Sequence, residues 1–174
     1  MSSKPILNIA DVEFRKMGHG VNFPGAENAP EQFQSKLGDI GRRIGAQKLG
    51  YNVTVVPPGK RAWPFHSHRV NEEMFFVLEG EGEVRVGAET FPIRTGDVIA
   101  HPPGGPETAH QIVNTSSAEL KYLAVSTRIS PEIADYPDSK KFGVLAEFPD
   151  KDGKPSVWRF VNRPEANLNY WDGE

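Results

Sequence analysis

The sequence contains no cysteine, and this absence limits the chemistry that the chain can perform. Disulfide bonds and thiolate ligands are excluded, so any metal ion must be held by histidine, aspartate, glutamate or water. Basic residues are also not in excess, since 20 lysines and arginines face 23 aspartates and glutamates and the net charge is −3. Without surplus cations to neutralise phosphates, we expect no nucleic acid partner.

Long hydrophobic runs are missing too, so we expect no membrane span. The first residues, from Met1 to Leu7, lack the apolar core of a secretory signal. We therefore expect a cytoplasmic protein. With 174 residues, 37% of them hydrophobic and 25% charged, the chain has the size of one ordinary domain and can bury a core.

Glycine (17) and proline (15) are numerous and lie between short runs of apolar and β-branched residues. This pattern predicts an all-β fold, either a sandwich or a barrel, in which many short strands are joined by turns. We expect strands over residues 40–44, 48–56, 61–68, 73–78, 83–87, 90–93, 98–101, 110–114, 120–127 and 157–161.

The two ends of the chain differ from this pattern. Residues 1–34 show no sustained periodicity and are expected to form an irregular arm, with a short helical turn over 29–37. A serine N-cap and a proline at the first helical position predict a short helix over Ser130–Ala134. No linker divides the chain, so we expect one domain: an N-terminal arm (1–35), a barrel (36–128) and a C-terminal extension (129–174) that packs on the barrel.

Three potential metal ligands lie close together at the start of a strand-like run. His66 and His68 are two residues apart, so on a strand both imidazoles point to the same face. Glu73 has the side-chain parity of Phe75, and it reaches the same space if residues 69–72 form a turn. Two histidines alone are more often ordinary surface or core residues, so the interpretation depends on a fourth donor from elsewhere in the chain.

The candidate for the fourth donor is His110, which opens a strand directly after the rigid loop Pro102–Pro106. Three imidazoles and one carboxylate fill four positions around a divalent ion and leave one or two positions open for water or substrate. Glu72 is the main competitor of Glu73 for the carboxylate position.

Two motifs around these residues resemble those of the cupin family. The first is Gly59…His66-Ser67-His68-(four residues)-Glu73-(six residues)-Gly80, and the second is Gly96-(five residues)-Pro102-Pro103-Gly104…His110-(three residues)-Asn114. They cover about residues 59–114, and the flanking strands extend the likeness to roughly 40–127. The chain departs from the family pattern by one extra residue between Gly59 and His66 and by the run 105–109, both in loops.

The resemblance implies a double-stranded β-helix, a jelly-roll barrel with a metal ion inside it near one mouth. It also implies that His66, His68, Glu73 and His110 are the metal ligands, and the spacing to Gly80 favours Glu73 over Glu72. The donor set does not distinguish Fe, Mn, Ni and Zn.

Further residues are candidates for the walls of a ligand pocket. We expect Phe75 to face the pocket because of its parity with Glu73, and Tyr122 to lie in the core or at the pocket. Asn114 shares the parity of His110 and is expected to orient a ligand, or else to hydrogen-bond local backbone. Arg61 is expected to meet an anionic substrate at the barrel mouth, unless it is a plain solvated charge.

His101 also lies near the site in the sequence, and two interpretations stay open for it. The favoured one is an outward-facing side chain at the surface or at a partner subunit, and the other is a group behind the metal ligands or a proton shuttle.

Two kinds of function fit these expectations. The first is a small-molecule metalloenzyme of the dioxygenase, isomerase or lyase type, and the second is a protein that binds or senses a small molecule without turnover. Outward apolar positions and aromatic residues in both arms predict a homodimer.

Overall fold

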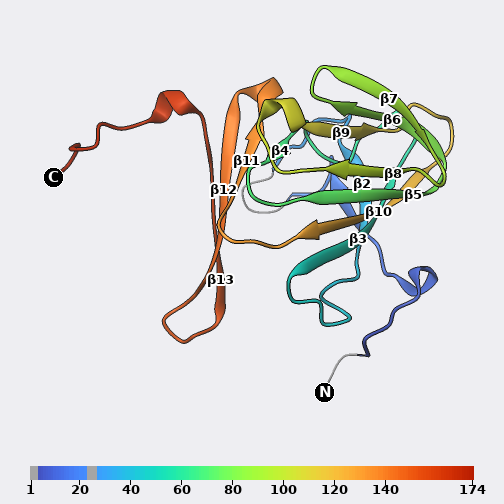
Figure 1. Cartoon of the computed structure of the whole chain (residues 1–174), viewed down its shortest axis with the longest axis horizontal. Coiled ribbons are helices and arrows are strands. Elements are labelled where there is room, and N and C mark those ends of the chain that lie inside the picture. Colours follow the sequence, from blue (N-terminus) through green and yellow to red (C-terminus); the bar gives the residue numbers. More distant parts are fainter. Residues whose placement is uncertain (1–3, 23–26) are drawn as a thin grey trace.

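The computed structural model describes residues 4–22 and 27–174, and strands dominate it (Figure 1). The strands are β1 (Arg15–Gly18), β2 (Gln34–Asp39), β3 (Leu49–Val56), β4 (Ser67–His68), β5 (Glu73–Glu79), β6 (Glu81–Val86), β7 (Glu89–Arg94), β8 (Val98–His101), β9 (His110–Val113), β10 (Leu120–Thr127), β11 (Glu132–Tyr136), β12 (Lys141–Pro149) and β13 (Pro155–Asn162). Four single-turn 3₁₀ segments, η1 (Ile9–Asp11), η2 (Pro106–Thr108), η3 (Pro137–Ser139) and η4 (Pro164–Ala166), complete the elements. The predicted all-β fold is confirmed.

Three sheets build the double-stranded β-helix. One sheet has the order β1-β2-β3-β10-β5-β8, a second has the order β7-β6-β9, and a third has the order β13-β12-β11-β4. The first two sheets enclose the barrel core, whereas β12 and β13 form a long hairpin at one side of it (Figure 1). Among the described residues, no helix is long and apolar enough to span a membrane, and the cellular location stays a prediction.

The barrel interior is filled by alternate residues of its strands. Side chains of β5 and β10 point inward at every second position, where Phe75, Val77, Leu120 and Tyr122 are all at most 5% exposed. Further buried members of this cluster are Val56, Ala62, Val84, Ile93, Ile112 and Ala124. The core therefore lies directly below the strand ends that carry the expected metal ligands.

Most predicted body strands occur within one or two residues of their expected bounds, but two predictions are wrong at the N-terminal side. The helical turn predicted over 29–37 is absent, because strand β2 occupies much of this stretch. The strand predicted over 40–44 is absent as well, because residues 41–45 form turns. Pairing of β2 with both β1 and β3 selects the extended conformation in the first of these stretches. The intrinsic conformational preference of so short a stretch contributes less to its stability than this strand pairing does. The expected strand over 61–68 is also shorter, since only β4 at its end is a strand.

The helix predicted over Ser130–Ala134 is wrong, because this segment enters strand β11. The Ser130 hydroxyl does not cap a helix; instead it accepts a hydrogen bond from the Glu147 backbone N–H of β12 at 2.8 Å. Strand β11 lies between β12 and β4, with Ala134 paired to His68. Residues beyond the expected barrel therefore pair directly with the strand that carries a candidate ligand.

At the two ends, the expected strand over 157–161 is confirmed within β13. The N-terminal segment is not wholly irregular, since β1 pairs with β2 and joins the large sheet. Residues 1–3 and 23–26 of the expected arm lie outside the described residues. The boundaries of arm, barrel and extension stay predictions.

Candidate metal centre

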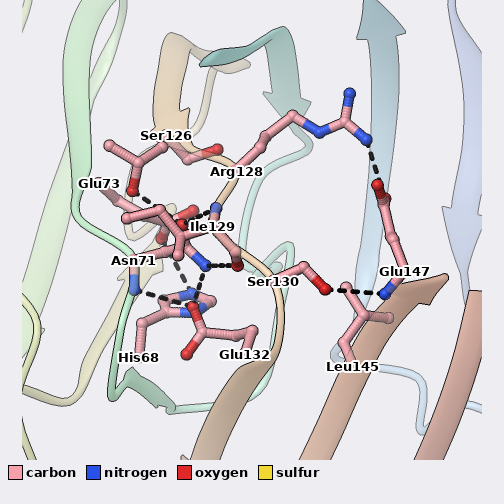
Figure 2. Close-up of a pocket in the computed structure, with 11 residues that line it drawn as sticks. His68, Asn71, Glu73, Ser126, Arg128, Ile129, Ser130, Glu132, Leu145 and Glu147 are labelled. Atoms are coloured by element: carbon pink, nitrogen blue, oxygen red, sulfur yellow. Dashed lines mark hydrogen bonds and ion pairs between the residues drawn. The ribbon is translucent and has the colours of Figure 1, made fainter. Parts of the chain in front are cut away.

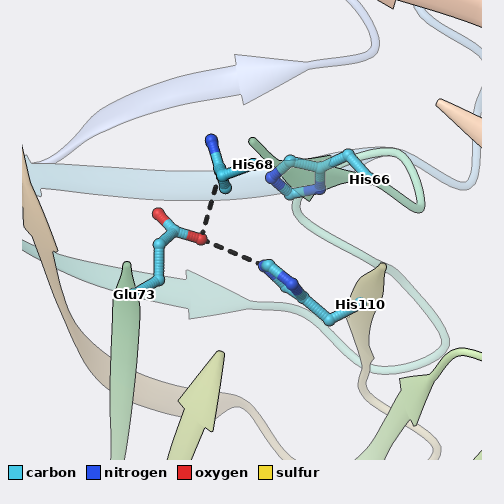
Figure 3. A group of neighbouring side chains, drawn as sticks. All are labelled: His66, His68, Glu73 and His110. Atoms are coloured by element: carbon cyan, nitrogen blue, oxygen red, sulfur yellow. Dashed lines mark hydrogen bonds and ion pairs between the residues drawn. The ribbon is translucent and has the colours of Figure 1, made fainter. Parts of the chain in front are cut away.

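Four side chains from three separate segments converge at one end of the barrel (Figure 3). They are His66 just before β4, His68 in β4, Glu73 at the start of β5 and His110 at the start of β9. One donor atom from each lies within 4.8 Å of the others. The structure thus brings together the four residues that the sequence motifs select. Glu72 is not among them, because its side chain is exposed.

Backbone hydrogen bonds hold two of the histidines in place. His66 and His110 form a β-bridge, in which the His110 N–H donates to the His66 carbonyl at 2.8 Å and the His66 N–H donates to the His110 carbonyl at 3.2 Å. This bridge joins the segment before β4 to β9. It explains how residues 44 positions apart place their rings 4.8 Å from each other, measured between centroids.

The Glu73 carboxylate contacts two of the three histidines of the cluster. Its Oε2 atom is 3.0 Å from Nε2 of His110 and 3.5 Å from Nε2 of His68. Burial alone would raise the pKa of Glu73, but the contacts with His110 and His68 hold this pKa well below its usual range. The carboxylate is therefore ionised across the physiological range and supplies one negative charge to the site.

Two of the histidines direct Nδ1 toward a backbone carbonyl. Nδ1 of His66 is 2.8 Å from the Pro64 carbonyl, and Nδ1 of His110 is 3.4 Å from the Thr108 carbonyl. A carbonyl only accepts, so the 2.8 Å contact indicates a proton on Nδ1 of His66 and a lone pair on its Nε2. In His110 the shorter contact is that of Nε2 with the Glu73 carboxylate, at 3.0 Å. Burial, followed by the neighbouring histidines, also lowers the pKa of His66 to about 4, so this ring is neutral near pH 7.

These donors fit a divalent metal ion. Nε2 of His110 and Oε2 of Glu73 approach to 3.0 Å, a distance at which a proton or a cation lies between them. Three imidazole nitrogens and one carboxylate oxygen suit Fe, Mn, Ni or Zn and leave coordination positions open. Residues His66, His68, Glu73 and His110 would hold the ion.

His101 lies inside the barrel, so the favoured interpretation of an outward-facing side chain is wrong. It pairs in register with Glu73 on the neighbouring strand, which places both side chains on the same face. It is only 2% exposed, and its ring stacks on that of His110 at 3.8 Å. The burial of His101 lowers its pKa to about 3. The sequence could not reveal this position because it depends on the register of β5 against β8.

Two of the expected pocket residues lie next to the centre or one layer below it. The Phe75 ring is 5.6 Å from that of His110 and 5.3 Å from that of Tyr122, measured between centroids. Tyr122 is 2% exposed, and burial raises the pKa of its phenol. Phe75 therefore forms an apolar floor beneath the cluster, and Tyr122 belongs to the core below it.

The other two expected residues lie elsewhere. Asn114 is fully buried, and its amide nitrogen donates to the carbonyls of Val56 at 2.8 Å and Ala118 at 2.7 Å, so it fastens a loop. Arg61 donates to Gln111 at 3.2 Å. Since Gln111 follows His110 on β9, it points to the opposite face of that strand. The structure does not bring either residue to the cluster, and their part in substrate binding stays a prediction.

A cavity of about 200 Å³ reaches the cluster from the side of the C-terminal segment (Figure 2). It is lined by His68, Asn71, Glu73, Ser126, Thr127, Arg128, Ile129, Ser130, Glu132, Leu145 and Glu147. Arg128 is the one lysine or arginine among these lining residues, and it pairs with Glu147 at 2.9 Å. The lining includes two of the four candidate ligands, His68 and Glu73.

Comparison with known proteins agrees with this architecture. A family model described as "Cupin domain" matches residues 52–126. An uncharacterized protein from Methanocaldococcus jannaschii is 36% identical over 72 residues, which are 41% of this chain, and the match spans only 54% of that relative. An oxalate-binding protein from Thermotoga maritima is 28% identical over 120 residues, covering 63% of this chain and 96% of that protein.

One solved structure resembles nearly the whole chain. It is a crystal structure from Silicibacter pomeroyi described as a sugar phosphate isomerase from a cupin superfamily, with a TM-score of 0.74 and 27% identity. The match covers 97% of this chain and 98% of that one. The likeness therefore includes both terminal segments as well as the barrel.

Proposed function

This chain is a small cupin-domain protein, and from that premise we propose that it is a metal-dependent enzyme acting on a small, oxygen-rich molecule. The observation that carries the proposal is the convergence of three imidazoles and one ionised carboxylate within 4.8 Å, beside a cavity. Sites with only part of the coordination sphere filled by protein are typical of catalysis or ligand capture.

A divalent ion at this centre would supply a Lewis acid for a carbonyl or hydroxyl oxygen of the substrate. The chain's own residues prepare the site for that chemistry. Glu73 is ionised and His66 is neutral near pH 7, so both are in the protonation state that a metal ligand needs. Phe75 closes the inner side with an apolar surface that excludes water from beneath the centre.

Among dioxygenase, isomerase and lyase chemistry, the proposal favours isomerase chemistry on a phosphorylated sugar or a related hydroxy-carbonyl compound. The support is the whole-length likeness to the structure described as a sugar phosphate isomerase, at 27% identity. Arg128 supplies a cation at the cavity wall for an anionic group of such a substrate. Fold alone does not select a reaction, so the support comes from these particular features.

A second candidate is a protein that retains a small dicarboxylate without turnover. The likeness to the oxalate-binding protein, over 96% of that relative, favours it. The same centre serves both functions, because a dicarboxylate also offers two oxygens to a metal ion with open positions.

One experiment separates the two candidates. Protein loaded with Fe(II), Mn(II), Ni(II) or Zn(II) is mixed with a panel of sugar phosphates and with oxalate, and NMR follows the ligands while calorimetry measures binding. Formation of an isomeric sugar phosphate by wild type, and not by Glu73→Gln, supports the enzyme. Tight binding of oxalate with no change in any sugar phosphate supports the second candidate and contradicts the first.

We also propose that two copies of this chain form a dimer through the hairpin of β12 and β13. Strand β13 is an edge strand, and its Trp158, Phe160 and Val161 side chains are each at least 40% exposed. An edge strand with apolar side chains is a template for pairing, and a second copy offers the same strand to a symmetric contact. Light scattering should give twice the chain mass for wild type and the chain mass for Trp158→Ser/Phe160→Ser; a monomeric wild type contradicts the dimer.

A further inference from the structure

The geometry points to Glu132 as a positioning residue of the metal centre. From β11 in the C-terminal segment, its carboxylate faces the outer nitrogen of His68 and fixes the turn that connects His68 to Glu73. This inference rests on the proposed metal binding, and it adds a residue outside both sequence motifs. The sequence did not reveal Glu132, because 58 residues or more lie between it and the segment from His68 to Glu73 that it contacts.

N–H groups surround the Glu132 carboxylate, and Figure 2 shows those of Asn71. Its residue is 6% exposed, and its Oε1 atom accepts from the backbone N–H groups of Arg69 at 3.1 Å, Val70 at 3.2 Å and Ile133 at 2.8 Å. Its Oε2 atom accepts from the Asn71 backbone at 2.9 Å and from the Asn71 side-chain amide. Five N–H groups thus converge on its two oxygens, an arrangement that favours the ionised carboxylate.

His68 lies between two carboxylates. Its Nδ1 atom is 3.5 Å from Oε2 of Glu132, and its Nε2 atom is 3.5 Å from Oε2 of Glu73. Both are ion-pair distances and not short, aligned hydrogen bonds. Both carboxylates only accept, so each ring nitrogen of the metal-free protein faces an acceptor for its proton. A metal ion at Nε2 would displace the proton there, and Glu132 would keep the proton on Nδ1. Nε2 is then directed to the centre, as it is in His66 and His110.

A comparison of the three histidines explains why His68 needs this distant partner. His66 and His110 each direct Nδ1 to the carbonyl two residues earlier, at 2.8 and 3.4 Å. For His68 the corresponding carbonyl belongs to His66, and that oxygen is directed at the His110 N–H in the β-bridge. Nδ1 of His68 faces Glu132 instead.

Glu132 also sets the separation of two ligands. Residues 69–71 lead from His68 toward Glu73, and their three successive backbone N–H groups all donate to Glu132. Pairing of Ala134 with His68 brings β11 against β4 and keeps the carboxylate at this place. Side chains that orient metal ligands from behind affect metal affinity by roughly 10- to 100-fold. The C-terminal segment, outside residues 52–126, thus completes the centre.

The test measures Co(II) affinity, by competition with a chelator, in wild type, Glu132→Gln and Glu147→Gln. Glu147 is a matched control, because its carboxylate lines the same cavity and contacts Arg128 but no ligand. We expect Glu132→Gln to bind Co(II) about 10- to 100-fold more weakly, with an altered visible spectrum, and Glu147→Gln to stay within about twofold of wild type. Asn71→Ala, which loosens the turn and leaves the carboxylate, should weaken binding less than Glu132→Gln.

Wild-type Co(II) affinity and spectrum in folded Glu132→Gln overturn the positioning role. Should Glu132→Gln fail to fold, ¹⁵N NMR of Zn(II)-loaded wild type decides: Nε2 coordination with a proton on Nδ1 of His68 supports the inference, and coordination through Nδ1 overturns it. A wild type that binds neither ion overturns the proposed function, and this inference with it. Loss of binding only in the variant leaves the proposed function intact.

Discussion

The ring of His101 lies 3.8 Å from that of His110, with an angle of 19° between their planes, and both residues are only 2% exposed. A buried imidazole is thereby packed flat against a candidate metal ligand. Neither ring nitrogen of His101 has a hydrogen-bond partner among the described residues. We therefore expect this ring to act by its shape, by limiting the tilt of His110.

Replacing His101 by phenylalanine tests this packing role. Phe keeps a flat ring and removes two unpaired polar atoms, each of which costs about 1–3 kcal/mol when buried. We expect His101→Phe to keep metal affinity within about threefold and to raise the unfolding temperature by a few degrees. His101→Ala, which leaves a cavity, should lower both. A lower unfolding temperature in His101→Phe, measured by calorimetry, contradicts this account because it means that the nitrogens are paired.

The stability of the metal-free protein should depend on pH in both directions. Burial lowers the pKa values of His66 and His101 to about 4 and 3, below the ordinary value of 6.5. Between pH 6.5 and about 4 the unfolded chain therefore binds protons that the folded chain does not, so stability falls as pH is lowered. The lowered pKa of Glu132 adds a further loss between pH 4.5 and about 2.

His68 acts in the opposite direction. Burial opposes its protonation, but Glu132 and Glu73 raise the pKa of His68 to about 9, so its contribution is full below pH 6.5 and is lost as pH rises to about 9. We expect the unfolding temperature of chelator-treated protein to be highest near pH 6.5 and to fall on both sides. A steady rise in stability from pH 6.5 down to pH 5 would show that His66 and His101 are not buried as neutral rings.

Arg128 should control the binding of anions at the cavity. Its guanidinium group pairs with Glu147 at 2.9 Å, and 32% of its side chain is exposed, so its effect on an anion is partly screened. We expect Arg128→Gln to weaken oxalate or sugar phosphate binding by about tenfold at low salt, measured by calorimetry. Arg42→Gln, at a side chain that is 77% exposed and outside this cavity, is the matched control. Equal losses in both variants would assign the effect to net charge alone.

The sequence was sufficient for the barrel and for the four converging residues. His66, His68 and Glu73 are separated by one short turn, and strand alternation places their side chains on one face. His110 was a candidate because it opens a strand after the Pro102–Pro106 loop, and the resemblance of the second motif to a known family supported it. The first three positions depend on local geometry, whereas His110 reaches the cluster through a long-range bridge to His66.

The remaining residues could not be predicted because their environment is set by long-range pairing. His101 lies inside the barrel because β8 pairs in register with β5, and Glu132 reaches His68 because β11 pairs with β4. The failed helix prediction at Ser130 has the same cause, since pairing with β12 and β4 selects a strand there. Neither register nor strand order is visible in the spacing of residues along the chain.

Metal content is the most direct test of the central claim. Elemental analysis compares wild type, Glu73→Gln and Glu72→Gln, purified in parallel in the presence of Fe, Mn, Ni and Zn. The two variants lose the same charge from adjacent residues, but only Glu73 contacts His110 and His68. We expect about one divalent ion per chain in wild type and Glu72→Gln, and a small fraction of that in Glu73→Gln. Equal metal content in all three proteins, or none in wild type, would contradict the claim.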